Sequence, residues 1–340
     1  MKKILFFFFS LVIGIVLLFG VVKFVGWGEI SSAFRIFASW QGMVIIVLTG
    51  LMLFFGMWKW KVILKDQGYD ISNKKLTFPY LAGFSLIYLF PMVVMGGEIF
   101  RSYVIKEKFG VPWKQGIISV AIDKILEGTA FLIAILAGII YFFFEIGLPP
   151  KNLAILLGSV VLVLVLGTGF FYLRSFRKKS IASVFLGKIS HNKFINGEIL
   201  EIEKEIFKFF KLTGSAFWQG LVLAFLRVGI TWFRCWILIV FLGKTIGFLP
   251  ALSILGFYYI ALFIPIPTAL GTHEIIQVFS FTALEIGANI APSFTMIQRG
   301  SEVILAILGL VIFLRLGIGL LQTLLFKKFE NLIDKYSNNH

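Results

Sequence analysis

Hydrophobic residues in this 340-residue sequence form long runs that charged residues rarely interrupt. A helix needs about 20 consecutive, mostly apolar residues to cross the hydrocarbon core of a bilayer. Seven uncharged or nearly uncharged runs reach or approach that length: 4–22, 36–58, 76–97, 128–144, 152–173, 212–226 and 245–272. The pattern therefore predicts an all-α polytopic membrane protein.

The composition excludes a water-soluble alternative. Hydrophobic residues make up 59% of the chain and charged residues 14%, and the mean hydropathy is +0.96. A chain with so few charged residues cannot form the polar surface of a water-soluble protein. The run 4–22 is followed by no small-residue cleavage site, which favours a retained helix over a signal peptide. Cys235 is the only cysteine, so an internal disulfide is excluded.

The distribution of basic residues predicts which hydrophobic runs cross the membrane and which return to the same side. Lysine and arginine number 32 against 17 acids, and they concentrate in short loops, which indicates contact with an anionic membrane surface rather than nucleic acid. If every run crossed, 15 basic loop residues would lie outside and 12 inside, against the positive-inside rule. If 77–95 re-enters from the cytoplasmic side and 247–292 from the outer side, 23 lie inside and 4 outside.

This contrast predicts one integral membrane domain over 1–340 of a cell membrane, with both termini cytoplasmic, six full transmembrane helices and two re-entrant hairpins. The six helices are expected near 4–22, 41–58, 116–144, 152–173, 213–243 and 295–326. Non-helical backbone at membrane depth must be buried in protein or line a cavity. Helix breakers occur in both hairpins: Pro91, Gly96 and Gly97 in the first, Pro265, Pro267 and Gly271 in the second.

An internal repeat supports the same plan. Pro91 and Glu98 recur as Pro267 and Glu274 with the same spacing, at an offset close to half the chain. Each half then consists of helix, hairpin and helix, and the two halves have opposite orientation, as in transporters with inverted repeats and broken helices. The predicted halves are about 1–173 and about 213–326, joined by the linker 174–211.

The linker carries a second predicted feature. Ile199, Ile202, Ile206 and Phe209 share one helical face, which predicts an amphipathic helix on the cytoplasmic membrane surface. A linker whose charges only fix the topology explains the same residues equally well.

Charged residues within the predicted helices are the candidate functional residues. A charge near the middle of a membrane helix costs about 2.5–3.5 kcal/mol on insertion scales, so each needs a partner or a function. They fall into three groups: Asp123, Lys124 and Glu127; Arg227 and Arg234; Arg299, Glu302 and Arg315. Spacing favours a self-satisfied salt-bridge cluster over a catalytic set in the first group, which the arginines of the second group are placed to neutralise. Arg315 is expected to snorkel.

The stretch "PMVVMGGEIFRSY" (91–103) allows two interpretations. In the first, Glu98 suits the dipole of the following helix and pairs with Arg101 one turn later. In the second, the bend presents backbone N–H groups and Arg101 to the phosphate of a lipid headgroup, with Glu98 contacting a cationic group or orienting the arginine. His273 and Glu274 after Gly271 pose the same choice.

Signatures of membrane enzymes are missing from the sequence. We find no D-x-x-D pair for Mg²⁺-diphosphate, no H-E-x-x-H, no G-x-S-x-G and no Cys/His metal spacing. The sequence therefore predicts neither catalysis nor a metal or other cofactor.

Two motifs resemble a known family. "GGEIFRSYVIKEKFGVPWKQGIISVAIDKILEG" (96–128) resembles the G-G-[DE]-x-x-R segment and the following acid-base-x-x-acid helix of the membrane domain of bacterial lysylphosphatidylglycerol synthases and their standalone, flippase-like relatives. "PIPTALGTHE" (265–274) is similar to the family's P-x-P-G-G-L-G-x-x-E, with Thr268 and Ala269 in place of two glycines. Arg299 stands where the family has an arginine in its last long helix.

The resemblance covers nearly the whole chain and implies lipid translocation or lipid binding. Because 14 residues follow Phe326, no soluble aminoacyl-transferase domain is expected and the synthase chemistry is not implied.

We therefore expect movement of an anionic or zwitterionic phospholipid, or of a polyprenyl-linked lipid, through a polar cavity within the membrane. An accessory subunit that binds a lipid-linked intermediate for a partner synthase or glycosyltransferase is the alternative, and a homo-oligomer is compatible with either. The residues expected to contact the lipid are Gly96, Gly97, Glu98, Arg101, Asp123, Lys124, Glu127, Arg227, Arg234, Gly271, His273, Glu274, Arg299 and Glu302.

Overall fold

The computed structural model describes residues 39–89, 96–147, 149, 151–183, 193–263 and 272–337, and within these residues the regular structure is helical without strands. Five helices are long and apolar enough to cross a membrane. They are α3 (Trp40–Asp66), α6 (Trp113–Glu145), α7 (Lys151–Phe176), α10 (Ser215–Phe241) and α13 (Ala291–Ser337). The predicted all-helical membrane protein is therefore confirmed, and the predicted span 4–22 lies outside the described residues.

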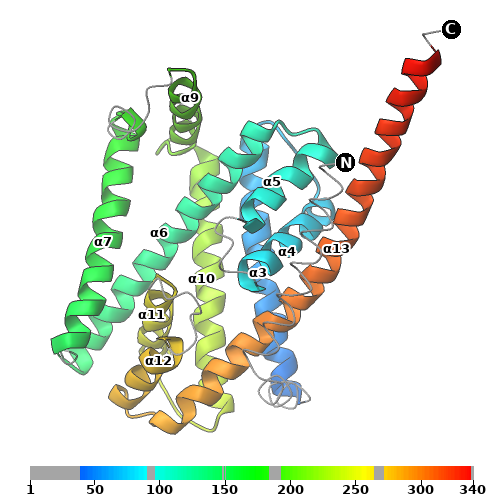
Figure 1. Cartoon of the computed structure of the whole chain (residues 1–340). Coiled ribbons are helices and arrows are strands. Elements are labelled where there is room, and N and C mark those ends of the chain that lie inside the picture. The colour runs from blue at the N-terminus through cyan, green and yellow to red at the C-terminus, as the bar shows by residue number, and fades with distance from the viewer. Residues whose placement is uncertain are drawn as a thin grey trace.

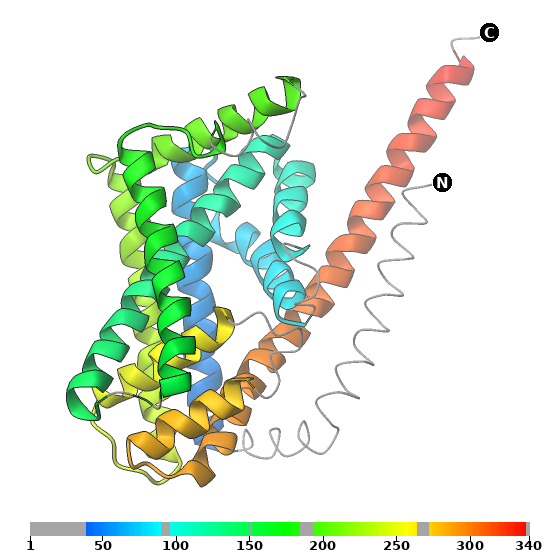
Figure 2. The ribbon, with the colours of Figure 1, turned by 60° about the vertical axis from the view of Figure 1, so that its left-hand side comes forward.

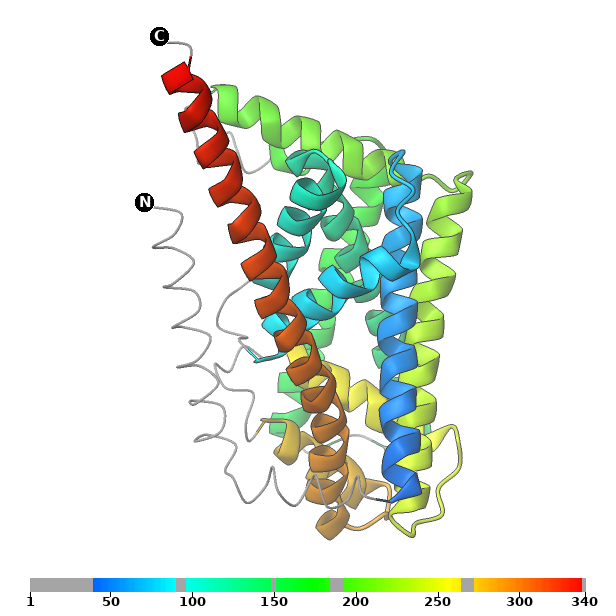
Figure 3. The same ribbon diagram turned by 90° about the vertical axis from the view of Figure 1, so that its right-hand side faces the viewer.

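The long helices differ in how much surface they bury against protein. α3 and α10 lie side by side along the bundle (Figure 3) and share an extensive interface. The most apolar stretch of α7, by contrast, has only 6% of its residues buried. A helix that exposes apolar side chains over most of its length is stable only in contact with lipid or another protein. Of these five helices, α7 therefore buries the smallest share of its most apolar stretch against the described protein.

Four shorter helices form two pairs. α4 (Asn73–Leu89) packs against α5 (Gly96–Phe109), and α11 (Pro250–Phe263) packs against α12 (Thr272–Ala283). The first pair lies in the half of the bundle that also carries α9, and the second pair lies in the opposite half (Figures 1 and 2). Residues 90–95 and 264–271, which include the predicted helix breakers Pro91, Pro265, Pro267 and Gly271, lie outside the described part of the chain.

Helix boundaries recur along the chain at a nearly constant offset. α3 and α10 have the same length, and the offset between their first residues equals the offset between their last. The offset between the start of α5 at Gly96 and the start of α12 at Thr272 differs from it by a single position. The packing recurs as well, because α4 packs along α13 while α11 packs along α6. In each half, the first helix of the short pair thus packs against the long helix of the other half, while the second helix, α5 or α12, packs against the long helix of its own half.

Close approach in these two interfaces depends on glycine. A Cβ at Gly138 on α6 would lie 2.6 Å from the carbonyl oxygen of Leu252 on α11. A Cβ at Gly309 on α13 would meet the carbonyl oxygen of Leu81 on α4. Small residues at membrane helix interfaces allow this backbone proximity.

The predicted linker contains the helix α9 (Lys193–Phe209), which lies across the end of the bundle (Figures 2 and 3). Phe209 is buried, and Ile202 and Ile206 pack against the same core. Lys114 on α6 lies 2.9 Å from Glu201 and 3.2 Å from Glu205, which ties α9 to the start of α6. The hydrogen bond from Lys114 lowers the pKa of Glu201 below its ordinary value.

Candidate functional site

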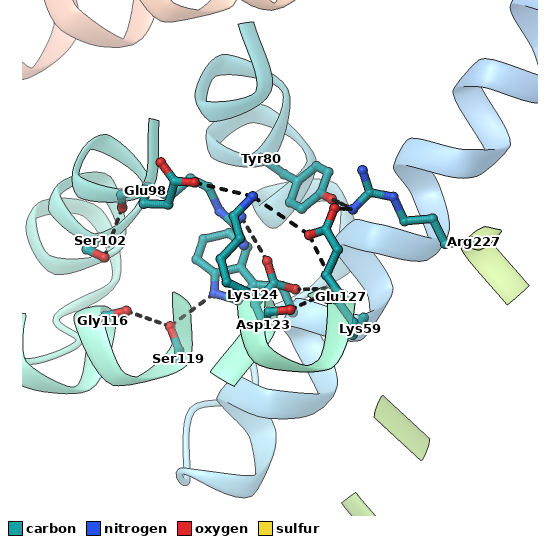
Figure 4. A network of polar contacts seen from close by, with 12 residues as sticks. Lys59, Tyr80, Glu98, Ser102, Gly116, Ser119, Asp123, Lys124, Glu127 and Arg227 are labelled. Carbon is teal, nitrogen blue, oxygen red and sulfur yellow. Dashed lines mark hydrogen bonds and ion pairs between the residues drawn. The ribbon is translucent and has the colours of Figure 1, made fainter. Parts of the chain in front are cut away.

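Seven of the charged residues in the bundle meet in one network, which we call the polar network (Figure 4). Four helices supply its members: Lys59 from α3; Glu98 and Arg101 from α5; Asp123, Lys124 and Glu127 from α6; and Arg227 from α10. Asp123 and Glu127 lie one turn apart on α6, so that α6 presents two carboxylates to three neighbouring helices. The network thus joins segments that are distant in sequence.

Asp123 is the centre of the polar network. Asp123 is 0% exposed, and its two carboxylate oxygens face cations from different helices. The Lys59 ammonium lies 3.1 Å from Oδ1 and donates a hydrogen bond of 2.9 Å to the Asp123 carbonyl oxygen. Arg101 donates from Nη1 to Oδ2 at 3.1 Å. One buried carboxylate therefore holds α3 and α5 against α6.

Aromatic rings hold Arg101 in place from α3 and α4. The guanidinium carbon lies 4.0 Å from the Trp60 ring centroid and 4.7 Å from the Tyr80 centroid. Trp60 is fixed in turn by a 3.0 Å hydrogen bond from Nε1 to Ser119 Oγ. Stacking on an aromatic face stabilises a cation without using its N–H donors. Arg101 Nε and Nη2 are buried and have no acceptor among the described residues.

Glu127 collects the remaining cations. Arg227 Nη1 lies 2.6 Å from Oε1, the distance of a strong charge-assisted contact. Lys59 and Lys124 both lie 3.7 Å from Oε2. Arg227 Nη1 is also 3.5 Å from the Tyr80 hydroxyl, which accepts from it. Arg227 thus neutralises an α6 acid across the bundle, as the sequence suggested.

Lys124 forms the accessible edge of the polar network and lies beside Glu98, which is buried. Their Nζ and Oε1 atoms are 3.3 Å apart, and Figure 4 shows Lys124 reaching between Glu98 and Glu127. The Lys124 side chain is 41% exposed, whereas those of Lys59 and Arg101 are 0% and 3% exposed. The intrahelical pair of Glu98 with Arg101 is not formed, because both side chains turn towards α6. Lys124 is therefore the most exposed cation of the polar network.

A second polar cluster lies between α3, α10 and α13. Arg234, 1% exposed, donates from Nη2 to Glu302 at 2.6 Å and from Nη1 to Thr49 at 2.8 Å. Thr49 donates to Ser301 at 3.0 Å, and the Tyr258 hydroxyl lies 3.5 Å from Glu302. Arg227 and Arg234, although two turns apart on α10, therefore belong to different clusters.

The other predicted site residues have different surroundings. Arg299 accepts a 3.2 Å hydrogen bond from Tyr88 through its carbonyl oxygen. Gly97 at the start of α5 lies against the backbone of Gly83. Gly271 and the side chains of His273 and Glu274 lie outside what the structure describes. Within the described chain, no three His, Cys, Asp or Glu residues gather as metal ligands would.

An apolar cavity is separate from both clusters. It has a volume of about 370 Å³ between α6, α7 and α11, and its lining includes Phe142, Leu157 and Phe257. None of the charged candidate residues lines it. Its apolar lining suits a lipid chain rather than a headgroup.

Comparison with known proteins places the sequence in a family. The profile described as lysylphosphatidylglycerol synthase TM region matches residues 7–309. The chain belongs to this family. The predicted membership in the family of lysylphosphatidylglycerol synthase membrane domains is thereby confirmed.

Two curated relatives are similar to this member of the family. A UPF0104 membrane protein of Methanocaldococcus jannaschii is 26% identical over 269 residues, which cover 74% of this chain and 78% of the relative. A UPF0104 membrane protein of Methanothermobacter thermautotrophicus is 26% identical over 155 residues, 46% of each chain. No solved structure matches the chain significantly.

The sequence prediction missed Lys59, which was counted in the cytoplasmic loop 59–75. α3 continues to Asp66, and Lys59 shares its buried face with Met52, Gly56 and Ile63. These four residues are spaced by four, three and four positions, which is the pattern of one helical face. This spacing could have predicted that Lys59 lies on the buried face of a longer helix. Arg101 was likewise counted as a loop residue. Moving both into the bundle leaves 21 basic loop residues inside against 4 outside, so the predicted topology is unchanged.

Replacing Lys59 tests whether the polar network stabilises the fold. Lys59→Met should lower the free energy of unfolding by about 3–5 kcal/mol, because it removes one partner of a buried carboxylate. Lys61→Met is the control, since Lys61 is 25% exposed and lies 3.8 Å from Asp70, and it should change stability by less than about 0.5 kcal/mol. Thermal and denaturant unfolding in detergent measure both. Equal stability of the two variants would contradict a central role for Lys59.

Proposed function

We propose that this protein moves lipid headgroups between the leaflets of a cell membrane, while the acyl chains stay in the bilayer. The observation that carries the proposal is the polar network, in which seven charged residues from four helices meet inside an apolar bundle and one edge is accessible. Ionisable residues within membrane helices are rare, face the bundle interior, and usually mark a pathway for a substrate or ion. A headgroup is the polar part of a membrane substrate that such a pathway would admit.

A purely structural role explains the network less well. Buried ion pairs often add little stability over well-packed apolar residues, so stability alone gives weak reason to gather seven charges. Lys124 is exposed, and buried donors of Arg101 and carboxylate oxygens of Glu98, Asp123 and Glu127 make no hydrogen bond among the described residues, so the network is not fully satisfied by its own members. These features support a site that exchanges its internal partners for those of a ligand.

We further propose that α4–α5 and α11–α12 are re-entrant hairpins in two inverted halves, with both termini cytoplasmic. The recurrence of helix boundaries at a nearly constant offset, the exchanged packing on α13 and α6, and the opposite ends occupied by the two pairs support this arrangement. At the offset that relates α3 to α10, Lys59 corresponds to Arg234 and Glu127 to Glu302. Both pairs are ion pairs, so each half carries a related buried contact.

An accessory role is the second candidate function. The family description names the membrane region of a synthase, which favours a domain that presents a lipid to a partner enzyme. Such a subunit would bind lipid but would need its partner for any change in lipid distribution. We propose no catalytic role, cofactor or metal for either candidate, and a homo-oligomer is compatible with both.

Accessibility of single cysteines tests the hairpins. In a Cys235→Ala background, a cysteine at Lys108 should react with impermeant reagents only from the cytoplasmic side, and one at Ala288 only from the outer side. Both positions are exposed: Lys108 lies near the C-terminal end of α5, and Ala288 follows α12. The basic loop residues place the first on the cytoplasmic side. Labelling of both positions from the same side of sealed vesicles would contradict the inverted arrangement.

Removing the accessible pair separates transport from folding. Glu98→Gln with Lys124→Gln removes an ion pair at the accessible edge without changing the net charge of the network. Because both partners are removed together, neither is left as an unpaired buried charge, so thermal stability should fall much less than in Lys59→Met. Loss of a charge-assisted contact to a headgroup is worth about 1.5–3 kcal/mol, so translocation in proteoliposomes should fall roughly ten- to hundredfold.

The matched control is Lys61→Gln with Asp70→Asn, which removes a pair on the surface. It should preserve both stability and translocation. Full translocation by the Glu98/Lys124 double variant would mean that this pair does not contact the substrate.

A further inference from the structure

The second polar cluster lies where α13 meets α3 and α10, a surface that we call the seam. α13 packs extensively along α4, and α3 packs extensively along α10, but α13 makes far fewer close approaches to α3 and α10. Polar side chains bridge the seam instead: Arg234 of α10 donates to Glu302 of α13, and Thr49 of α3 donates to Ser301 of α13. A hydrogen bond contributes little net free energy when water can replace it. The seam is therefore easier to open than the closely packed interfaces of α13 with α4 and of α3 with α10.

Two donors at the seam lack acceptors. Arg234 Nε and Gln298 Nε2 are buried and make no hydrogen bond among the described residues. Both oxygens of the Glu302 carboxylate, by contrast, are engaged, Oε1 by Arg234 at 2.6 Å and Oε2 by the Tyr258 hydroxyl at 3.5 Å. A buried donor without an acceptor carries a desolvation penalty, which a water molecule would remove. Hydration of the seam would therefore supply the acceptors that its closed form lacks.

The seam lies between the polar network and the end of the bundle opposite to α9 (Figure 3). Arg227 of the polar network and Arg234 of the seam are seven residues apart on α10, which is about 10 Å along the helix axis. Arg234 is the nearer of the two to the end of α10 that the proposed topology places outside. Thr49 and Glu302 likewise lie towards the ends of α3 and α13 on that side. A headgroup that leaves Lys124 for the outer leaflet would therefore meet the seam.

We propose that the seam is a gate, which the contacts of Arg234 with Glu302 and Thr49 hold closed in this structure. This inference rests on the proposed function and adds a second conformation to it. Opening separates α13 from α3 and α10, and water replaces the polar contacts that are lost. Water also satisfies Arg234 Nε and Gln298 Nε2, which offsets part of the cost of opening. The balance between the closed and open forms is therefore one that a headgroup can shift.

Cys235 reports the opening of the gate. It is the sole cysteine of the chain, is fully buried, and donates to Gln298 across the seam at 3.6 Å. In sealed vesicles that hold the full-length protein, a small charged methanethiosulfonate reagent should label Cys235 from the outer side only. Glu302→Gln should speed this labelling about tenfold or more, because loss of a charge-assisted contact raises the open population by that factor. Glu107→Gln, at an acid that pairs with Lys106 outside the seam, is the matched control and should leave the rate unchanged.

A reversible cross-link tests the gate without removing a charge. The hydroxyl oxygens of Thr49 and Ser301 are 3.0 Å apart, so thiols at these two positions can form a disulfide bond across the seam. In a Cys235→Ala background, Thr49→Cys with Ser301→Cys should stop moving lipid in proteoliposomes after treatment with a thiol oxidant, and a reductant should restore the movement. Each single cysteine variant, treated with the same oxidant, is the control and should keep its activity.

The outcomes separate the gate from the proposed function. Equal translocation by the oxidised and reduced double variant overturns the gate even though lipid is moved. Labelling of Cys235 at equal rates from both sides, or at a rate that a folded Glu302→Gln variant leaves unchanged, also overturns it. If Glu302→Gln does not fold, the cross-link decides. Labelling that follows the prediction in a protein that moves no lipid supports the gate and overturns transport, whereas labelling and a reversible block as predicted support both.

Discussion

The carboxylate of Asp123, held between Lys59 and Arg101 in the interior of the bundle, is the contact on which the site depends. It joins α3, α5 and α6, and it positions Lys124 and Glu127 on the same helix towards the remaining partners. Removing Lys59 or Arg101 leaves the buried Asp123 carboxylate poorly compensated, and that cost is large in a low-dielectric interior. The position of the short helix α5 is therefore coupled to the charge state of the network.

The second polar cluster shows how the two halves differ within a shared plan. Arg234 pairs with Glu302 as Lys59 pairs with Glu127, but Gln298 stands at the position that the repeat relates to Asp123. An amide in place of a carboxylate removes one negative charge. Among the described residues, Arg234 therefore has a single acidic partner and fills its other contact with the Thr49 hydroxyl. The first half concentrates charge at an accessible edge, whereas the described contacts of the second half form a compact neutral pair.

Four of the five described spans were predictable from uncharged runs, because run length and membrane thickness determine them; the fifth, in α13, matches no uncharged run and was predicted from the topology and the repeat. The charge spacing on α6 was also visible in the sequence. The contacts of these residues with other helices were not visible in the sequence, because they depend on which helix faces pack together. Glu98 and Arg101 are one turn apart, yet each pairs with α6. Lys59 follows an apolar run and therefore looked like the start of a loop, although α3 continues beyond it to Asp66.

An experimental structure in lipid nanodiscs that contain phosphatidylglycerol would test the central claim most directly. The account predicts density for a lipid headgroup within hydrogen-bonding distance of Lys124 Nζ, with Asp123 still bound by Lys59. It also predicts a longer separation between Lys124 and Glu98 than the 3.3 Å seen here. A network that stays closed on its own carboxylates, with ordered lipid only at the outer surface of the bundle, would contradict it.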